Sequence, residues 1–268
     1  MTGSIQGTSM DVDELRRTYN REQRINIHDP SFRRIQSDYL VRHVDRQGQT
    51  SFISYSALNA DNADAIIREQ LDYFARLGHN LEWKYYSYDT PKDLKARLIK
   101  HGFDVGEDDA VLILPVAHLP EQLTQPVTYD IRRITKVEDL EDVNRVQQHV
   151  WDEDLRPLTA RLAYEMQRSP GFISIYIAYV DGIPASYGRI HFPRGNAFAS
   201  LWGGATVPAY RRRGLYTQLL IVRAQEAKRR GIAYLTVEAN SMSRPILEKY
   251  GFICIGYSNA CYWAHQAK

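Results

Sequence analysis

The sequence "TVPAYRRRGLYTQLLIVRAQ", residues 206–225, joins an apolar run to an amphipathic segment through three arginines and one glycine. The run "LWGGATV" predicts a strand, and "LYTQLLIVRAQEAKRR" predicts a helix. A helix start leaves its first N–H groups unpaired and carries a partial positive charge, so this junction favours a bound phosphate. Gly214 permits close approach to the backbone, and Arg211, Arg212 and Arg213 add charge. The alternative interpretation is a solvated basic helix start without a ligand.

The composition indicates a globular protein of two units. At 268 residues the chain exceeds the usual size of one domain, so we expect two medium domains rather than one large one. Apolar residues make up 44% of the chain, which is ample for a core. The formal net charge of +2 is too small for nucleic-acid or membrane binding by bulk electrostatics. Any anion site must therefore be local.

The cysteines and the ends of the chain carry no strong signal. Cys254 and Cys261 have no histidine spacing that suits zinc, so we expect buried thiols and no metal site. The first residues lack an apolar signal core, and no apolar run approaches ~18 residues. These features predict a cytoplasmic protein.

Proline and charge patterns divide the chain. Residues 38–45 and 49–58 predict a hairpin around a Gln-Gly turn, and "DNADAIIREQLDYFARLG" predicts a helix that stops at Gly78. The strand "AVLILPV" closes this first unit. The predicted parts are a peripheral N-terminal arm over 1–30, an α/β unit over 31–117, a proline-containing linker over 118–127 and a second α/β unit over 128–268.

The second unit repeats the order of the first. In the second unit, the sequence predicts a hairpin that turns at Asp181-Gly182. The segment from "RRGIAYLTVE" to "ILEKYGF" then has the order helix, Gly, strand, Pro-containing helix, Gly-Phe. The segment from "RLGHNLEWKYY" to "RLIKHGF" has the same order. The final strands "FICIGYS" and "ACYWA" follow. This pattern predicts two related units, the first truncated at its front, although two common α/β patterns can also coincide by chance.

The motif residues resemble the GNAT acyltransferase superfamily, whose pyrophosphate loop reads Arg/Gln-x-x-Gly-x-Gly/Ala. Here the loop is Arg211 to Tyr216, Pro208 lies six residues before the glycine, and Asn240 and "EKYGF" follow in family order. The resemblance covers about residues 128–265, and residues 38–117 only faintly. It implies an α/β mixed-sheet GNAT acyltransferase fold in tandem arrangement, with a truncated N-terminal GNAT-like unit.

The resemblance also implies cofactor contacts. The backbone of the loop would hold the pyrophosphate of acetyl-CoA, the end of the preceding strand would pair with the pantetheine, and the two neighbouring strands would splay to admit the thioester. The residues so implied are Arg211, Arg212, Arg213, Gly214, Leu215 and Tyr216 in the loop, Gly204, Ala205 and Thr206 in the strand, and Asn240. The first unit has Asp61 and Asp64 at the corresponding helix start, so we expect it to bind no cofactor of its own.

Two positions depart from the family pattern. Tyr216 replaces the last small residue of the loop, and we expect its ring to point along the helix into the core. Leu247 stands where many members carry the tyrosine that protonates the leaving thiolate, so Tyr250, Tyr257 or water would have to replace it. Glu238, at a strand end facing the slot, is the candidate base; the alternative is a solvated carboxylate.

Acceptor contacts are less specific. The acidic stretch "WDEDL", 151–155, would favour a cationic amine or form a plain exposed loop, and His149 and His191 are more typical of surface or core positions than of catalysts.

The predicted function is acetyl transfer from acetyl-CoA to a primary amine of a small molecule or peptide, by direct attack in a ternary complex. Alternatives are transfer of another acyl or aminoacyl group, a non-catalytic acyl-CoA-binding sensor, and an arginine patch for nucleic acid. The near-neutral charge argues against the last.

Overall fold

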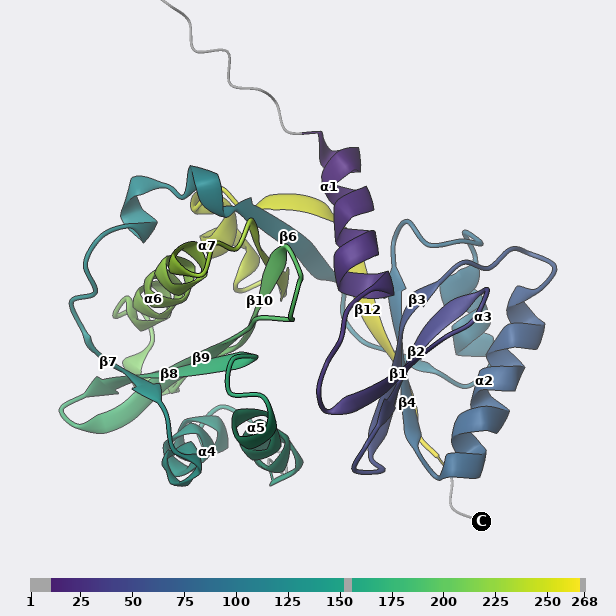
Figure 1. Cartoon of the computed structure of the whole chain (residues 1–268), viewed down its shortest axis with the longest axis horizontal. Helices are drawn as coiled ribbons and strands as arrows, with labels where there is room; N and C mark the ends of the chain where they lie inside the picture. Colours follow the sequence, from purple (N-terminus) through teal and green to yellow (C-terminus); the bar gives the residue numbers. More distant parts are fainter. Residues whose placement is uncertain (1–10, 152–155, 266–268) are drawn as a thin grey trace, which may run out of the picture.

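The computed structural model describes residues 11–151 and 156–265, and within them twelve strands form one continuous sheet (Figure 1). The elements of the N-terminal half are α1 (Val12–Tyr19), the π-helix η1 (Asn20–Ile25), β1 (Phe32–Gln36), β2 (Leu40–Asp45), β3 (Thr50–Ser56), α2 (Ala63–Leu77), β4 (Asn80–Tyr86), α3 (Leu94–Lys100), β5 (Asp104–Val105) and β6 (Asp109–Pro115).

Two short 3-10 helices, η2 (Val116–His118) and η3 (Glu121–Leu123), lead to the C-terminal half. Its elements are β7 (Asp130–Ile134), η4 (Val137–Asp139), α4 (Leu140–Gln148), α5 (Arg156–Arg168), β8 (Ile173–Val180), β9 (Ile183–His191), β10 (Phe198–Thr206), η5 (Pro208–Tyr210), α6 (Leu215–Arg229), β11 (Tyr234–Ala239), α7 (Arg244–Lys249) and β12 (Ile253–Trp263). The predicted hairpin turn at Asp181-Gly182 is confirmed, with φ of 51° and 77° at the two residues.

The two halves share one connectivity, as the internal repeat predicts. In the N-terminal half α2 connects the parallel strands β3 and β4, and in the C-terminal half α6 connects the parallel strands β10 and β11. The other strand pairs are antiparallel. Each half is therefore an antiparallel meander followed by one parallel crossover.

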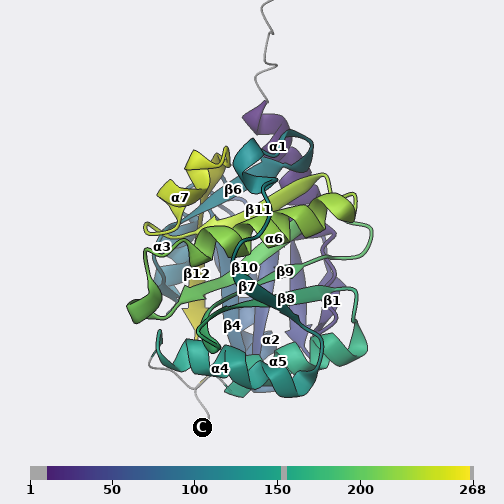
Figure 2. The ribbon, with the colours of Figure 1, turned by 90° about the vertical axis from the view of Figure 1, so that its left-hand side faces the viewer.

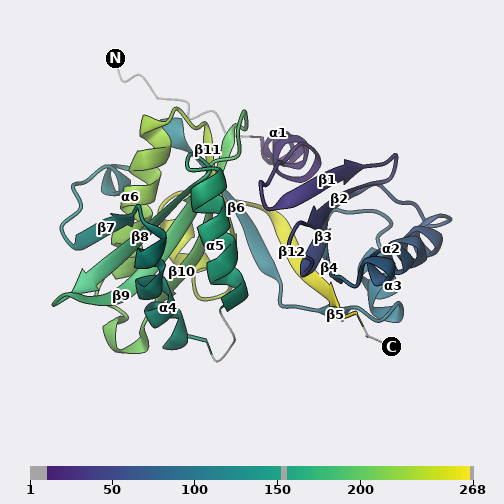
Figure 3. The same ribbon diagram turned by 60° about the horizontal axis from the view of Figure 1, so that its bottom comes forward.

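The halves exchange their last strands. β6 pairs with β11 of the C-terminal half, while the end of β12 pairs with β4 of the N-terminal half. β6 and β12 also pair with each other, so they join the two halves at the middle of the sheet (Figure 3). The two strands predicted at the end of the chain are one long strand, with an irregularity between Cys254 and Gly256.

Helices cover the sheet differently in the two halves. In the C-terminal half α6 lies on one face and α4 and α5 lie on the other (Figure 2). In the N-terminal half α2 and α3 lie on the side of β1–β4 that is turned away from the C-terminal half (Figure 1). The opposite face of these strands, which we call the inner face, is turned towards β10, β11 and α5.

We predicted a peripheral N-terminal arm. This prediction is wrong for the part of the arm that the structure describes, residues 11–30. Leu15 and Tyr19 of α1 are buried in a cluster with residues of β4, β6, β10 and β12. Arg24 is 1% exposed and donates two hydrogen bonds of 2.8 Å to the carboxylate of Asp89. The sequence does not reveal these few anchoring residues, because the side chains between them are mostly polar and half-buried or exposed.

The predicted linker is anchored to α6. Leu123 is fully buried in the core of the C-terminal half, and Gln225 of α6 donates a hydrogen bond of 2.7 Å to the carbonyl of Gln125. In the parts of the chain that the structure describes, every helix is too short or too polar to cross a membrane.

The strand exchange predicts that the C-terminal half does not fold alone. A fragment of residues 128–268 lacks β6 beside β11 and leaves the end of β12 without β4, so we expect it to aggregate. Co-expression with residues 1–127 should restore a soluble one-to-one complex. Size-exclusion chromatography and circular dichroism test this, with the intact chain as control; a monomeric fragment that unfolds cooperatively on its own would contradict it.

Candidate active site

The loop from Arg211 to Gly214 exposes backbone to solvent at the start of α6. Gly214 is the N-cap with φ of 84° and offers no capping side chain, and Arg212 also has a positive φ of 61°. A Cβ at Gly214 would meet only the Tyr129 hydroxyl, at 4.0 Å, so the space above the helix start is open. With three exposed arginines around these amides, the loop fits a pyrophosphate.

Tyr216 packs on Gly204 of β10. A Cβ added to Gly204 would lie 2.8 Å from Cε2 of the Tyr216 ring, so the ring occupies the space of a side chain at Gly204. Burial raises the pKa of Tyr216. The half-buried ring thus lies against β10, where the lack of a side chain at Gly204 leaves room for it.

β10 and β11 diverge at the point where a thioester slot is predicted. Their parallel pairing includes Phe198–Tyr234 and ends at Ser200–Thr236, although β10 continues to Thr206 and β11 to Ala239. β10 also has an irregular register against β9 between Trp202 and Ala205. The strands therefore splay beside the loop, on the side where Gly204 to Thr206 lie.

A cavity of about 460 Å³ begins at this divergence and extends between the two halves. We call it the seam cavity. Its lining includes Ser200, Leu201 and Trp202 of β10, Thr236, Val237 and Glu238 of β11, Glu82, Lys84 and Tyr86 of β4, Arg189 and His191 of β9, and Arg161 and Glu165 of α5.

Glu238 joins the two halves across the seam cavity. Its carboxylate accepts hydrogen bonds from Lys84 Nζ at 2.8 Å and from the Tyr86 hydroxyl at 3.1 Å. β12 and β6 separate β4 from β11, which would be about 14 Å apart in a flat sheet, so the sheet must bend to allow this contact. Burial alone would lower the pKa of Lys84, but Glu238 and Glu82 outweigh it and raise that pKa.

A second polar group lines the far end of the seam cavity. Glu165 is 1% exposed, and burial together with the nearby Asp29 raises its pKa to about 7. His191 Nε2 lies 3.8 Å from Glu165 Oε2, and burial and the charge of Arg189 hold the His191 pKa well below its usual value. The sequence did not indicate Glu165 or Arg189, because they come from separate elements and belong to no motif.

Of the three predicted catalytic residues, only Glu238 lines the seam cavity. Tyr250 packs against the core of the C-terminal half, and the Tyr257 hydroxyl accepts a hydrogen bond of 2.8 Å from Arg244. Leu247 is fully buried. The amide oxygen of Asn240 accepts hydrogen bonds from the backbone before α7, at 3.0 and 3.1 Å. The roles of both tyrosines and of Asn240 stay predictions.

The remaining sequence candidates lie elsewhere. Of the acidic stretch 151–155, residues 152–155 are outside the described residues, and His149 is exposed with Nδ1 bonded to the Arg145 carbonyl. Cys261 is buried and Cys254 half-buried, both as free thiols. At the start of α2, Asp64 pairs with Arg97 and His101. Within the described ranges, no cluster of three or more His, Cys, Asp or Glu side chains could hold a metal ion.

The contact between Gly204 and Tyr216 predicts a coupled pair. Gly204→Ala should lower the free energy of unfolding by about 1–3 kcal/mol, because the methyl group collides with the ring. The same change in a Tyr216→Ala background should cost far less, and denaturant titration of the four proteins measures the difference. Gly171→Ala is the control, since nothing lies within 4 Å of its added Cβ. Equal costs in both backgrounds would contradict the coupling.

Comparisons with known proteins agree with this geometry. Residues 137–252 match the model of the Acetyltransferase (GNAT) family. No curated protein matches the chain in sequence. The fold resembles a GCN5-related N-acetyltransferase from Kribbella flavida, with a TM-score of 0.65, 16% identity and coverage of 94% of this chain and 93% of that one.

Two further structures have the same fold. One is a conserved protein of unknown function from Staphylococcus epidermidis, with a TM-score of 0.68, 12% identity and coverage of 88% and 95%. The other is a tandem GNAT protein from the clavulanic acid biosynthesis pathway, with a TM-score of 0.56, 15% identity and coverage of 96% and 89%. Residues 137–252 therefore form a domain of the GNAT acetyltransferase family, within a tandem GNAT fold that spans nearly the whole chain.

Proposed function

We propose that the protein transfers an acetyl group from acetyl-CoA to a primary amine that is bound in the seam cavity. The observation that carries this proposal is the divergence of β10 and β11 after Ser200–Thr236, because β10 runs from the cavity wall at Ser200–Trp202 to the arginine loop. Arg211 to Tyr216 would hold the pyrophosphate, and Gly204 to Thr206 the pantetheine. Acetyl-CoA supplies a thioester, from which the attacking amine displaces the thiolate.

Glu238 is the residue best placed to receive the proton of the amine. Each of its oxygens accepts one hydrogen bond, from Lys84 or Tyr86, and keeps a second lone pair for the amine. These two contacts fix the orientation of the carboxylate at the splay. Beyond Ser200, the described β10 backbone has no partner on β11, and its N–H groups are candidates to stabilise the oxyanion.

A second candidate function is a non-catalytic acyl-CoA sensor. It is favoured by Leu247, which fills the usual acid position with a fully buried apolar side chain. Tyr250 and Tyr257 do not line the seam cavity either. An enzyme with this site would return the proton to the thiolate through water.

Binding of acetyl-CoA is expected to depend on Gly214. In isothermal titration calorimetry, Gly214→Glu should weaken binding by at least about tenfold, because a carboxylate at the loop repels the pyrophosphate. Gly231→Glu is the matched control at the other end of α6: it also has a positive φ, of 70°, and open space around its Cβ. We expect it to bind like the wild type. No binding by the wild type would exclude both the enzyme and the sensor.

Catalysis is expected to depend on Glu238. With acetyl-CoA and a panel of primary amines, thiol release should show a kcat about 10²–10⁴-fold lower for Glu238→Gln, because the acceptor for the amine proton is lost. The affinity for acetyl-CoA should not change. Glu248→Gln removes the same charge from α7, outside the lining of the seam cavity, and its kcat should stay within a few-fold of wild type. Binding without thiol release across the panel would instead support the sensor.

A further inference from the structure

The seam cavity has opposite charges at its two ends. At the end beside the splay, Lys84 Nζ lies 2.8 Å from Glu238 and 3.6 Å from Glu82. Two carboxylates share one ammonium there, which leaves an excess negative charge. That end suits the ammonium form of an acceptor amine.

The far end has a buried cation with incomplete hydrogen bonding. Arg189 is 8% exposed, and its Nε and Nη1 have no hydrogen-bond partner in the described part of the chain. The carboxylate of Glu165 on α5 acts on Arg189, but burial raises the pKa of Glu165 to about 7 and so weakens this compensation at neutral pH. A buried guanidinium without full compensation costs free energy in the unliganded protein, and a bound anion offsets that cost.

The cations of both ends lie near the Trp202 indole. Lys84 Nζ lies 5.5 Å from the centroid of the Trp202 indole, and Arg189 Cζ lies 6.0 Å from the same centroid. His191 stacks on this indole, with the ring centroids 6.1 Å apart. Lys84 Nζ and Arg189 Cζ therefore lie no more than about 12 Å apart, a span that a small molecule can bridge.

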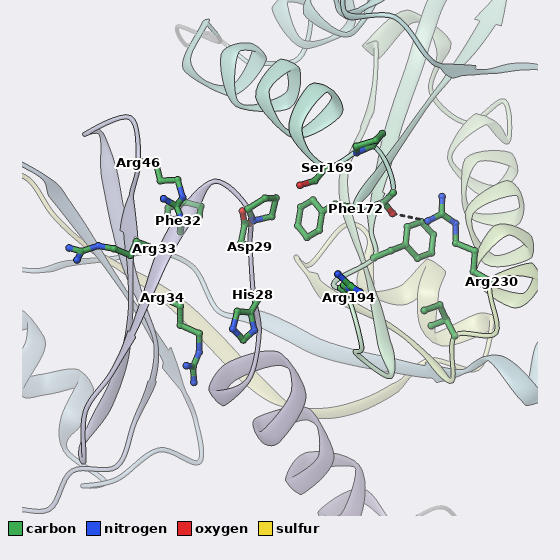
Figure 4. A pocket seen from close by; sticks show the side chains of 15 residues that line it. His28, Asp29, Phe32, Arg33, Arg34, Arg46, Ser169, Phe172, Arg194 and Arg230 are labelled. Carbon is green, nitrogen blue, oxygen red and sulfur yellow. Dashed lines mark hydrogen bonds between the residues drawn. The ribbon is translucent and has the colours of Figure 1, made fainter.

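The approach to the far end is also basic. A cavity of about 830 Å³, here the outer cavity, shares Asp29, Phe32 and Phe172 with the seam cavity. Figure 4 shows its walls, with Arg34 and Arg46 on the N-terminal side and Arg194 and Arg230 on the C-terminal side. Arg33 also lines it, and Asp29 is the one carboxylate in its described lining. Such a positive wall attracts an anionic ligand towards Arg189.

We propose that the acceptor is a small amino acid-like molecule, with its amine between Glu238 and Glu82 and its carboxylate at Arg189. This inference rests on the proposed function for the reaction, but the two ends of the cavity define the ligand class independently. The amine would then lie at the splay, where the thioester is expected, and the carboxylate would hold the molecule in that orientation.

The test compares matched acceptors that differ only in charge. β-Alanine, γ-aminobutyrate and L-lysine are each paired with their carboxamide. Calorimetry without acetyl-CoA measures binding, and thiol release with acetyl-CoA measures KM and kcat. We expect each carboxylate to bind the wild type at least about tenfold more tightly than its amide. For Arg189→Gln, the KM for the carboxylates should rise at least about tenfold while the KM for the amides stays constant.

Three readouts separate this role from a structural one. Arg189→Gln without ligand should be as stable as the wild type or more stable, because it removes a buried, poorly compensated cation. Arg189→Lys should recover part of the preference for the carboxylate. Arg76→Gln removes the same charge from the exposed end of α2, whose residues line neither cavity, and should leave KM unchanged.

The outcomes distinguish the two proposals. If the carboxylates bind through Arg189 but no amine is acetylated, the ligand class holds and the acetyltransferase proposal fails. If amines are acetylated with equal KM for both members of each pair, or if Arg189→Gln affects both members alike, the ligand class is overturned and the acetyltransferase proposal stands. Equal or absent binding of all the probes in calorimetry also overturns the ligand class.

Discussion

The pairing of β6 with both β11 and β12 is the constraint on which the rest of the structure depends. β6 belongs to the first half of the chain but pairs with β11, the last strand of the parallel crossover in the second half, and β12 pairs in the same way with β4 of the first half. Because these bonds are sheet ladders, the halves cannot rotate about a flexible linker without breaking them. The bend at this joint brings Lys84 to Glu238, and thereby the inner face of the N-terminal strands to the splay of β10 and β11. The seam cavity exists because of this bend.

Local chemistry made part of the fold predictable. The junction at 206–225 combines a strand, a turn with Gly214 and an amphipathic helix, and each of these signals is encoded within a few residues. The hairpin at Asp181-Gly182 is likewise set by two residues that tolerate positive φ. The partner of a strand is not local information. The run at 110–116 is apolar on both faces, which predicts a central strand but not which half of the chain supplies its neighbours.

The candidate site was predictable to the same extent. The arginine loop and Glu238 could be predicted because both lie within one ordered series of sequence motifs. The structure places Glu238 in the lining of the seam cavity. Lys84, Glu165 and Arg189 come from β4, α5 and β9, and only the three-dimensional fold brings them around Trp202. The buried ion pair of Arg24 could not be predicted for the same reason, since its partner Asp89 is 65 residues away. Isolated charged residues in a sequence look solvated until their partners are known.

The exchanged strands also affect how the chain acquires its structure during synthesis. β4 is made early, but its neighbour lies at Ser258–Trp263, close to the end of the chain. The sheet of the N-terminal half therefore cannot be completed until almost the whole polypeptide has been synthesised. Until then its apolar strand edges stay exposed. Contacts of such large sequence separation slow folding and lengthen the time in which misassembly competes. A ribosome-bound chain that stops before β12 would hold neither half in its final form.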